Sequence, residues 1–349
     1  MKYLKEAAAL GLVAALCLGG CGGDQTVTED NAPSDLLKKA AAITSESDGK
    51  DLEEVLHELV RQTGEANQYR LILEENEQEQ NLEENGGKLS AVNTDYEVYD
   101  VRYVGDAHFY QVYEEQTSDS STWELMDSTP NAITRVYVTP VKEDEFGSEE
   151  ARVIVDSISG DPGEQAGNED NVQTIVSNSI VYPIYLQTGS TLLLNPTEHP
   201  EDYNFQLMKK GDTYEWTISM KDEESYNKKM DQAYQEAYGA LRTDIYEDSS
   251  FVLDSRDVKE VRIVITMDQE GTISKIENST KTTAVYQDQS LDLTSNNTLN
   301  IKAAPEDWHE FFRTFFEQTA NGKIGVADEV TILPKKGDSD LSVQSEDSK

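Results

Sequence analysis

The fold is indicated most clearly by the segment Val261-Arg262-Ile263-Val264-Ile265-Thr266-Met267-Asp268-Gln269-Glu270-Gly271-Thr272-Ile273-Ser274-Lys275-Ile276. Branched apolar residues recur at alternate positions on both sides of the segment from Asp268 to Gly271. A period of two is typical of a strand with one buried face, and glycine supplies the positive φ that a tight turn needs. The stretch therefore predicts an antiparallel hairpin.

The same reasoning, applied to the rest of the chain, predicts further strands and four helices. Strands are expected at 69–73, from about 96 to the turn at Gly105-Asp106, and at 109–113, 123–126, 133–139, 152–155, 203–208, 214–219, 258–267, 272–278, 282–286 and 291–301. Helices are expected at 51–63, at 172–186 with Pro183 as its end or kink, at 223–242, and from Pro305 to about Asn321-Gly322. This order predicts an α+β fold in which a curved antiparallel β-sheet is covered on one face by several amphipathic helices. We expect one domain, residues 51–334.

The start of the chain has the composition of an export signal. Lys2 and Lys5 precede an apolar run at 7–18, which is too short to span a bilayer. Leu18-Gly19-Gly20-Cys21 resembles the lipobox of bacterial lipoproteins. That resemblance implies removal of residues 1–20, a diacylglyceryl group on Cys21, and attachment to the extracytoplasmic face of the cell membrane. The alternatives are an ordinary cleaved signal and a buried apolar helix.

The two ends of the mature chain are polar. Residues 21–50 are expected to form a lipidated N-terminus and a flexible acidic tether, with one transient helical turn near Leu36-Leu37. Residues 335–349 are expected to form a disordered acidic tail. The only cysteine besides Cys21 is Cys17, inside the predicted signal, so the mature chain is expected to have no disulfide.

The formal net charge of −39 restricts the partners. A nucleic-acid backbone would be repelled, and the sequence has no cluster of lysine and arginine with interleaved aromatic residues. Anionic lipid headgroups would be repelled as well, so the body of the protein is expected to stand off the bilayer on its tether. The need for solubility explains the large excess of acidic residues. Loose buffering of cations is the alternative explanation.

The order of elements resembles the LolA/LppX-like superfamily of lipoproteins and lipoprotein carriers. The resemblance lies in the first helix and the following run at 69–73, the hairpin at Gly105-Asp106 and the run at 261–276. It spans residues 51–302, and the aromatic helix after Pro305 lies beyond it. It implies a half-open antiparallel barrel around an apolar cavity for acyl chains, and it assigns no functional residue.

Motifs for catalysis are absent from the sequence. Its four histidines, at 57, 108, 199 and 309, lack the spacing of paired metal ligands. The sequence has no glycine-flanked nucleophilic serine, phosphate-binding glycine loop or dinucleotide fingerprint. A dispersed triad stays open, because sequence order does not reveal one. We expect no enzyme activity and no cofactor.

Part of the opening stretch also matches a calcium loop. Six residues fall on positions of a twelve-residue EF-hand pattern: Thr266, Asp268, Glu270, Gly271, Ile273 and Glu277. Its first position should be aspartate and its flanks should be helical, whereas here strand-forming residues lie on both sides. We therefore favour the hairpin turn, and keep Asp268, Glu270 and Glu277 as the alternative metal site.

Two predicted helices carry aromatic stripes that suit either a core or the wall of a ligand cavity. The candidate cavity-lining residues are Tyr226, Tyr234, Tyr238, Trp308 and Phe312. Such stripes usually belong to a core, but buried tyrosine hydroxyls need partners or water, which suits a cavity wall.

Two functions from different classes follow. The first is a tethered protein that binds an apolar or amphipathic ligand, such as a lipid or lipopeptide. The second is an envelope interaction or structural lipoprotein with a solid core. Solute capture for an importer is a weaker reading, because the alternating strand and helix pattern of two-lobed binding proteins is missing.

Overall fold

The computed structural model describes residues 33–105, 108–117, 121–141, 151–161, 169–181, 187–188, 191–192, 194–238, 253–305, 307–334 and 341–343. Within these ranges, no helix combines the length and the apolar composition that crossing a membrane requires. Five α-helices lie in the described part: α2 (Asp35–Ala42), α3 (Gly49–Ala66), α4 (Glu169–Val181), α5 (Glu223–Tyr238) and α7 (Trp308–Ala320). A 3-10 turn, η4 (Pro200–Asp202), precedes β9.

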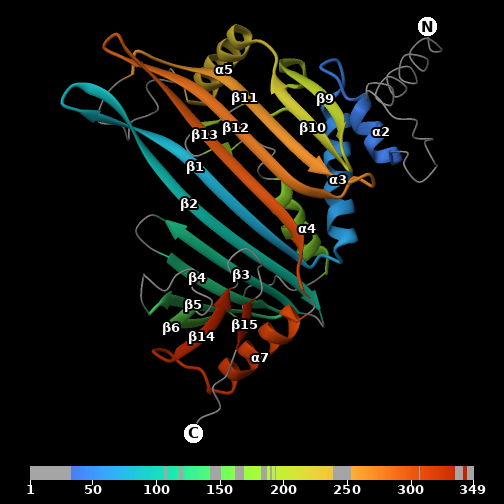
Figure 1. The fold of residues 1–349 in the computed structure, drawn as a ribbon, viewed down its shortest axis with the longest axis vertical. Helices are drawn as coiled ribbons and strands as arrows, with labels where there is room; N and C mark the ends of the chain where they lie inside the picture. The colour runs from blue at the N-terminus through green and yellow to red at the C-terminus, as the bar shows by residue number, and fades with distance from the viewer. Residues whose placement is uncertain are drawn as a thin grey trace. The chain divides into compact units, whose positions relative to one another are not determined.

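Most of the described chain is strand. The strands are β1 (Leu71–Asn85), β2 (Lys88–Gly105), β3 (His108–Thr117), β4 (Ser121–Ser128), β5 (Ile133–Pro140), β6 (Ala151–Asp161), β7 (Gln187–Thr188), β8 (Thr191–Leu192), β9 (Tyr203–Lys210), β10 (Thr213–Met220), β11 (Ser255–Met267), β12 (Ile273–Tyr286), β13 (Gln289–Ala303), β14 (Glu329–Pro334) and β15 (Leu341–Val343). All but β7 and β8 form one large antiparallel sheet in the order β15-β14-β6-β5-β4-β3-β2-β1-β13-β12-β11-β10-β9. The order has two ends, so the described sheet is open (Figure 1). A large antiparallel sheet with helices confirms the predicted class.

The contacts divide the chain into two compact units. Unit 1 comprises Met1–Thr63, Gln78–Asn93 and Ile180–Thr298, and unit 2 comprises Gly64–Glu77, Thr94–Ser179 and Leu299–Lys349. The long strands β1, β2 and β13 contribute residues to both.

The predicted hairpin lies at the centre of unit 1. Strands β11 and β12 pair around the turn, with Ile265 opposite Ile276, and Gly271 adopts a φ of +92°. A Cβ added to Gly271 would lie 3.1 Å from a side-chain atom of both Leu36 and Leu59, so helices α2 and α3 approach this turn closely. The sequence therefore needs glycine here for its conformation and for its small size.

Helix α2 corrects the predicted tether. The prediction carries the tether to residue 50, whereas the structure shows an ordered helix from Asp35. Ser34 caps this helix by accepting a hydrogen bond from the Leu37 N–H, and its own N–H donates to the carbonyl of Gln269 at 3.1 Å. Leu37 and Ala40 are fully buried, so residues from about 34 onward belong to unit 1.

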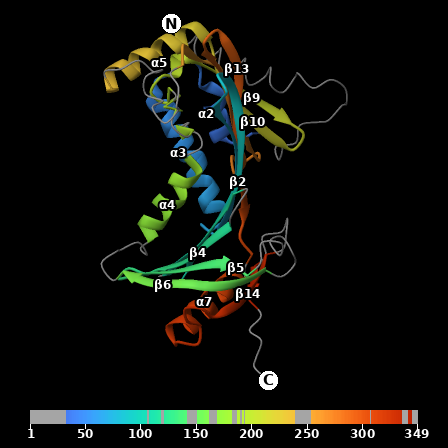
Figure 2. The same cartoon turned by 90° about the vertical axis from the view of Figure 1, so that its left-hand side faces the viewer.

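Unit 2 has its core between helix α7 and the sheet. Strands β3 to β6 pair in sequence order, and helix α7 lies along this part of the sheet (Figure 2). Alternate apolar residues of the strands pack with those of α7. The resulting α7 cluster comprises Ile72, Tyr110, Val112, Trp123, Leu125, Val136, Val138, Val153, Val155, Ala304, Trp308, Phe311, Phe312, Phe315, Phe316 and Ile324. The sequence predicted this helix and these strands.

Three other details differ from prediction. Strands β1 and β2 are much longer than expected and meet at Gly86-Gly87, where both φ values are positive. The two strands expected at 272–278 and 282–286 form a single strand, β12. Leu341–Val343, inside the predicted tail, form β15 and pair with β14.

Candidate functional site

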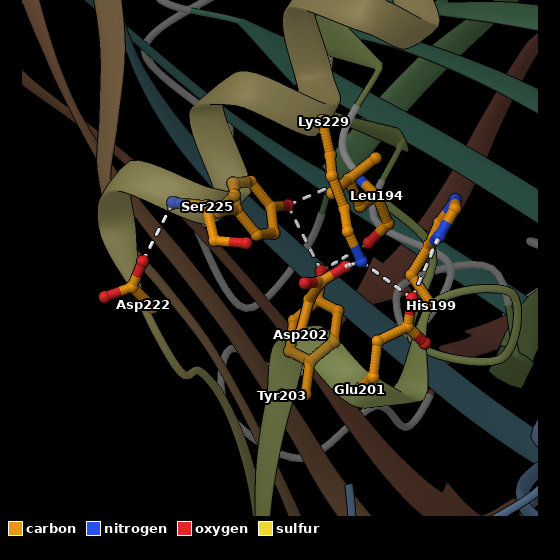
Figure 3. Close-up of polar contacts among 9 residues, drawn as sticks. Leu194, His199, Glu201, Asp202, Tyr203, Asp222, Ser225 and Lys229 are labelled. Atoms are coloured by element: carbon orange, nitrogen blue, oxygen red, sulfur yellow. Dashed lines mark hydrogen bonds and ion pairs between the residues drawn. The ribbon is translucent and has the colours of Figure 1, made fainter.

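A cluster of polar side chains joins helix α5 to the start of strand β9 within unit 1 (Figure 3). The Nζ of Lys229 lies 2.6 Å from Asp202 Oδ2 and 2.7 Å from Glu201 Oε1. Only 7% of Asp202 is exposed, so the ammonium neutralises a nearly buried carboxylate. His199 lies at the edge of the cluster, with its Nδ1 3.9 Å from Glu201 Oε1. We call these four residues the Lys229 cluster.

Local structure holds each member of the Lys229 cluster in place. Pro200 begins the turn η4, where its fixed φ suits a first helical position, and this turn presents Glu201 and Asp202 together. Helix α5 begins after Asp222, whose Oδ1 accepts a hydrogen bond from the Ser225 N–H at 2.8 Å. That cap fixes the first turns of α5 and therefore the position of Lys229.

The charges in the cluster stabilise one another. The hydrogen bond from Lys229 lowers the pKa of Glu201, because it favours the ionised carboxylate. Partial burial alone would lower the pKa of Lys229, but hydrogen bonds to Asp202 and Glu201 outweigh it and raise that pKa. The Glu201 carboxylate and the Lys229 ammonium therefore stay ionised at neutral pH.

A second set of contacts lies beside the first and involves two tyrosines (Figure 3). The Tyr203 hydroxyl donates to the carbonyl of Leu194, and the Leu194 N–H donates to the Tyr226 hydroxyl at 3.1 Å. The two hydroxyl oxygens lie 3.1 Å apart. Burial, with Tyr226 next to it, raises the pKa of Tyr203 well above its usual value, so this hydroxyl remains a donor. The Leu194 N–H and the Tyr203 hydroxyl thus satisfy Tyr226, the first of the candidate cavity-lining residues.

The Lys229 cluster has the donor set of a metal site. One ligand atom from each of His199, Glu201 and Asp202 lies within 4.8 Å of the other two. Imidazole and carboxylate ligands suit zinc and similar ions. The Lys229 ammonium, however, bonds both carboxylates at the distances of direct hydrogen bonds. It acts as their cation, so we assign the cluster the role of fastening α5 to β9.

The α7 candidates are packed against one another. The Phe312 ring stacks on Tyr110 with 5.3 Å between centroids and on Trp308 with 5.7 Å. Trp308 is 1% exposed and Phe312 is 0% exposed. The Nε1 of Trp308 is buried and has no hydrogen-bond acceptor among the described atoms. These residues form a continuous apolar core. Their role as cavity-lining residues stays a prediction, because a ligand could reach them only if α7 moved away from the strands.

Other sequence-predicted residues are placed only in part. Tyr234 and Tyr238 belong to helix α5, but their side chains lie outside the described residues. Cys21 and the whole of residues 1–32 lie outside them too.

The calcium-loop residues belong to the β11–β12 hairpin. Asp268 Oδ1 accepts hydrogen bonds from the backbone N–H groups of Glu270 and Thr272, at 2.9 and 2.8 Å. Glu277 Oε1 lies 2.7 Å from Lys275 Nζ. Both flanks are strands, as the hairpin interpretation predicts.

Sequence reasoning missed the Lys229 cluster. Its hydrogen bond joins residues 27 positions apart, and no motif links a lysine in a helix to a distant Glu-Asp pair. The available signals are local: Pro200 ahead of two acidic residues, and Asp222 as a helix cap.

A hollow of about 440 Å³ follows the outward face of α3. Its lining is polar and charged: Lys50, Glu53, Glu54, His57, Glu58 and Arg61.

Comparison with known proteins gives no family. No protein-family model matches the chain, and no curated protein matches it. Among solved structures, ywiB from Bacillus subtilis aligns at 7% identity over 68% of this chain and 93% of its own, with a TM-score of 0.14. A DUF1329 family protein from Desulfovibrio piger ATCC 29098 aligns at 9% identity over 76% of this chain and 98% of its own, with a TM-score of 0.22. Both TM-scores are too low to establish a shared fold.

Proposed function

We propose that this chain is a lipid-anchored protein on the extracytoplasmic face of a bacterial membrane, and that it acts through its surface as a non-catalytic interaction module. The observation that supports this function is the packing of the candidate cavity-lining side chains. A side chain that borders a space large enough for water keeps accessible surface, whereas Trp308, Phe312 and Tyr226 keep almost none. The close packing of these three side chains supports a solid core in each unit, and a solid core leaves the surface to bind partners.

The anchor in this proposal is the diacylglyceryl group on Cys21, which the lipobox resemblance implies. The net charge of −39 would keep the folded body away from anionic headgroups. The Cys21→Ala variant should appear in the medium or in a soluble extracytoplasmic fraction. A variant that stays bound to membranes, as the unmodified chain does, would contradict the anchor.

A second function, binding of a lipid or lipopeptide, is favoured by one feature of the α7 cluster. The Trp308 indole N–H is buried without an acceptor, and an unpaired buried donor is costly. An amphipathic ligand with a polar acceptor would relieve that cost if α7 moved away from the strands. The half-open barrel, covered on one face by amphipathic helices, belongs to this second proposal.

Native mass spectrometry of the full-length Cys21→Ala variant, purified from its producing cells, discriminates between the two functions. The surface function predicts the mass of the protein alone. A non-covalent lipid at a fixed ratio, lost in Trp308→Phe, would instead support the second function. Trp308→Phe removes the indole N–H and keeps an aromatic ring in the cluster, so it serves as the matched variant.

A further inference from the structure

Three residues form a row across the face of unit 2 that lies opposite α7. Tyr113 of β3 is directly opposite Glu124 of β4, and Glu124 is directly opposite Tyr137 of β5. Their chain neighbours Val112, Leu125 and Val136 point into the α7 cluster. Because successive side chains of a strand point to opposite faces, the row lies on the other face.

Both tyrosines of the row are exposed. Tyr113 is 36% exposed and Tyr137 is 40% exposed. Among the side chains that the structure describes, the large exposed hydrophobic ones are Val92, Tyr113, Tyr137 and Val326. The two aromatic members of that set therefore lie on one row, two strands apart. Exposed aromatic residues that gather in this way are typical of a binding surface.

The centre of the row is polar and locally neutral. Glu124 Oε1 lies 3.2 Å from the Nε of Arg135, and both side chains are half-buried. Burial and the nearby Glu124 carboxylate raise the pKa of the Tyr137 hydroxyl, so it remains a hydrogen-bond donor. The row thus offers acceptors and donors between two aromatic faces, without a net charge at its centre.

We propose that Tyr113, Glu124, Tyr137 and Arg135 bind a neutral, extended oligosaccharide. Two strand spacings place the tyrosines about 10 Å apart, which is the scale of one disaccharide unit. Aromatic rings present an apolar face to the C–H face of a sugar, and a few fixed polar groups bond its hydroxyls. The net charge of −39 disfavours an anionic polysaccharide.

This proposal rests on the proposed surface function, because it names the class of molecule that the surface binds. The two can fail separately. If neither sugar binds, the mass spectrum can still show the protein alone, and the surface function then stands without the sugar. If the mass spectrum shows a bound lipid, the surface function fails, whatever the sugar titration shows.

The test is titration of the full-length Cys21→Ala variant with two β-linked sugars, chitohexaose and cellohexaose, by calorimetry. Saturable binding of at least one sugar is expected. Tyr113→Ala and Tyr137→Ala should each weaken it about tenfold, because each removes one stacking face. Tyr137→Phe should weaken it less than Tyr137→Ala does, because it keeps the stacking ring and removes only the hydroxyl donor. Val92→Ser removes an exposed apolar side chain of unit 1 that is not part of the row, and it should bind like the parent.

Three outcomes would overturn the proposal. The first is no saturable binding of either sugar by the folded protein. The second is unchanged affinity in both alanine variants. The third is that the parent binds oligolysine and neither sugar, and that the alanine variants lose this binding. That result would assign the row to a cationic partner. Circular dichroism of each variant checks that the sheet is intact.

Discussion

Helices α5 and α7 both carry aromatic residues toward a sheet, but different contacts hold them in place. Helix α5 of unit 1 is fastened by polar contacts: Tyr226 to Leu194, Lys229 to Asp202, and Asn227 to both backbone groups of Val258 at 2.8 Å. Helix α7 of unit 2 is held by stacked aromatic rings. The two helices have similar aromatic stripes in the sequence. Even so, α5 is fixed by specific polar bonds and α7 by apolar burial.

A tyrosine in an aromatic stripe therefore does not by itself indicate a water-filled cavity. The Tyr226 hydroxyl finds its partner in the backbone of a segment more than thirty positions away. In α7, phenylalanine has no hydroxyl to satisfy, and the cluster closes without polar bonds to the rings. Variants of each helix test both modes of attachment.

Phe312→Ala should have the largest effect, because Phe312 lies fully buried at the centre of the α7 cluster. Removing a buried phenylalanine typically lowers the free energy of unfolding by about 3–5 kcal/mol. Urea unfolding measured by tryptophan fluorescence gives the value. Glu317→Ala, on the exposed side of the same helix, is the control and should stay within about 0.5 kcal/mol. A loss below about 1 kcal/mol for Phe312→Ala would show that the cluster is not close-packed.

Lys229→Met should destabilise unit 1 by about 3 kcal/mol, because it leaves the Asp202 carboxylate buried without its cation. The side chain keeps its length, so the effect reports the charge. Lys228→Met changes an exposed neighbour on the same helix and is the matched control. Adding Asp202→Asn to Lys229→Met should restore part of the loss. Equal unfolding midpoints for the two lysine variants would contradict the fastening role.

Tyr226→Phe should cost about 2 kcal/mol, because it leaves the buried Leu194 N–H without its acceptor and keeps the ring. The measurement is again the free energy of unfolding. Tyr286→Phe, which removes a less buried hydroxyl bonded to Glu84, should cost less than half as much. A neutral Tyr226→Phe would mean that another group or water satisfies Leu194.

Glu201→Gln should give the smallest effect, and one that depends on pH. Lys229 lowers the pKa of Glu201 in the folded state, so the unfolded chain takes up this proton at higher pH. The stabilisation is present above the ordinary pKa of 4.5 and is lost as the pH falls through the lowered value. The difference in unfolding free energy between parent and variant should therefore shrink below pH 4.5. A difference that is constant down to the acid transition would exclude Glu201 as its source.

The sequence predicts the regular parts of the fold well, because periodicity and turn residues act locally. The hairpin around Gly271, helix α3 and the aromatic face of α7 all follow from spacing. The β1–β2 hairpin escapes this reasoning, although Gly86-Gly87 is a strong turn signal. The residues before it, Glu74–Asn85, are mostly glutamate, glutamine and asparagine, which have low strand propensity. Pairing with neighbouring strands overrides that propensity.

The candidate site could be predicted only in part, because its contacts are long-range. Sequence reasoning selected Tyr226. It did not select Tyr203 and Asp202, which lie outside helix α5, or Lys229, which lies on α5 but forms an ion pair. Helix α2 was missed because eight residues give a short pattern, and its burial depends on the distant turn at Gly271. Tertiary contacts between segments decide these details.

Hydrogen exchange of the full-length Cys21→Ala variant tests the central claim, a solid interior beneath α7, most directly. Amides of α7 should exchange only through unfolding of unit 2, with the same free energy as the slowest amides of β4 and β5. Phe312→Ala should speed all of them together. Exchange of α7 through a separate opening of much lower free energy, while β4 and β5 stay protected, would contradict the solid core and identify α7 as a lid over a ligand site.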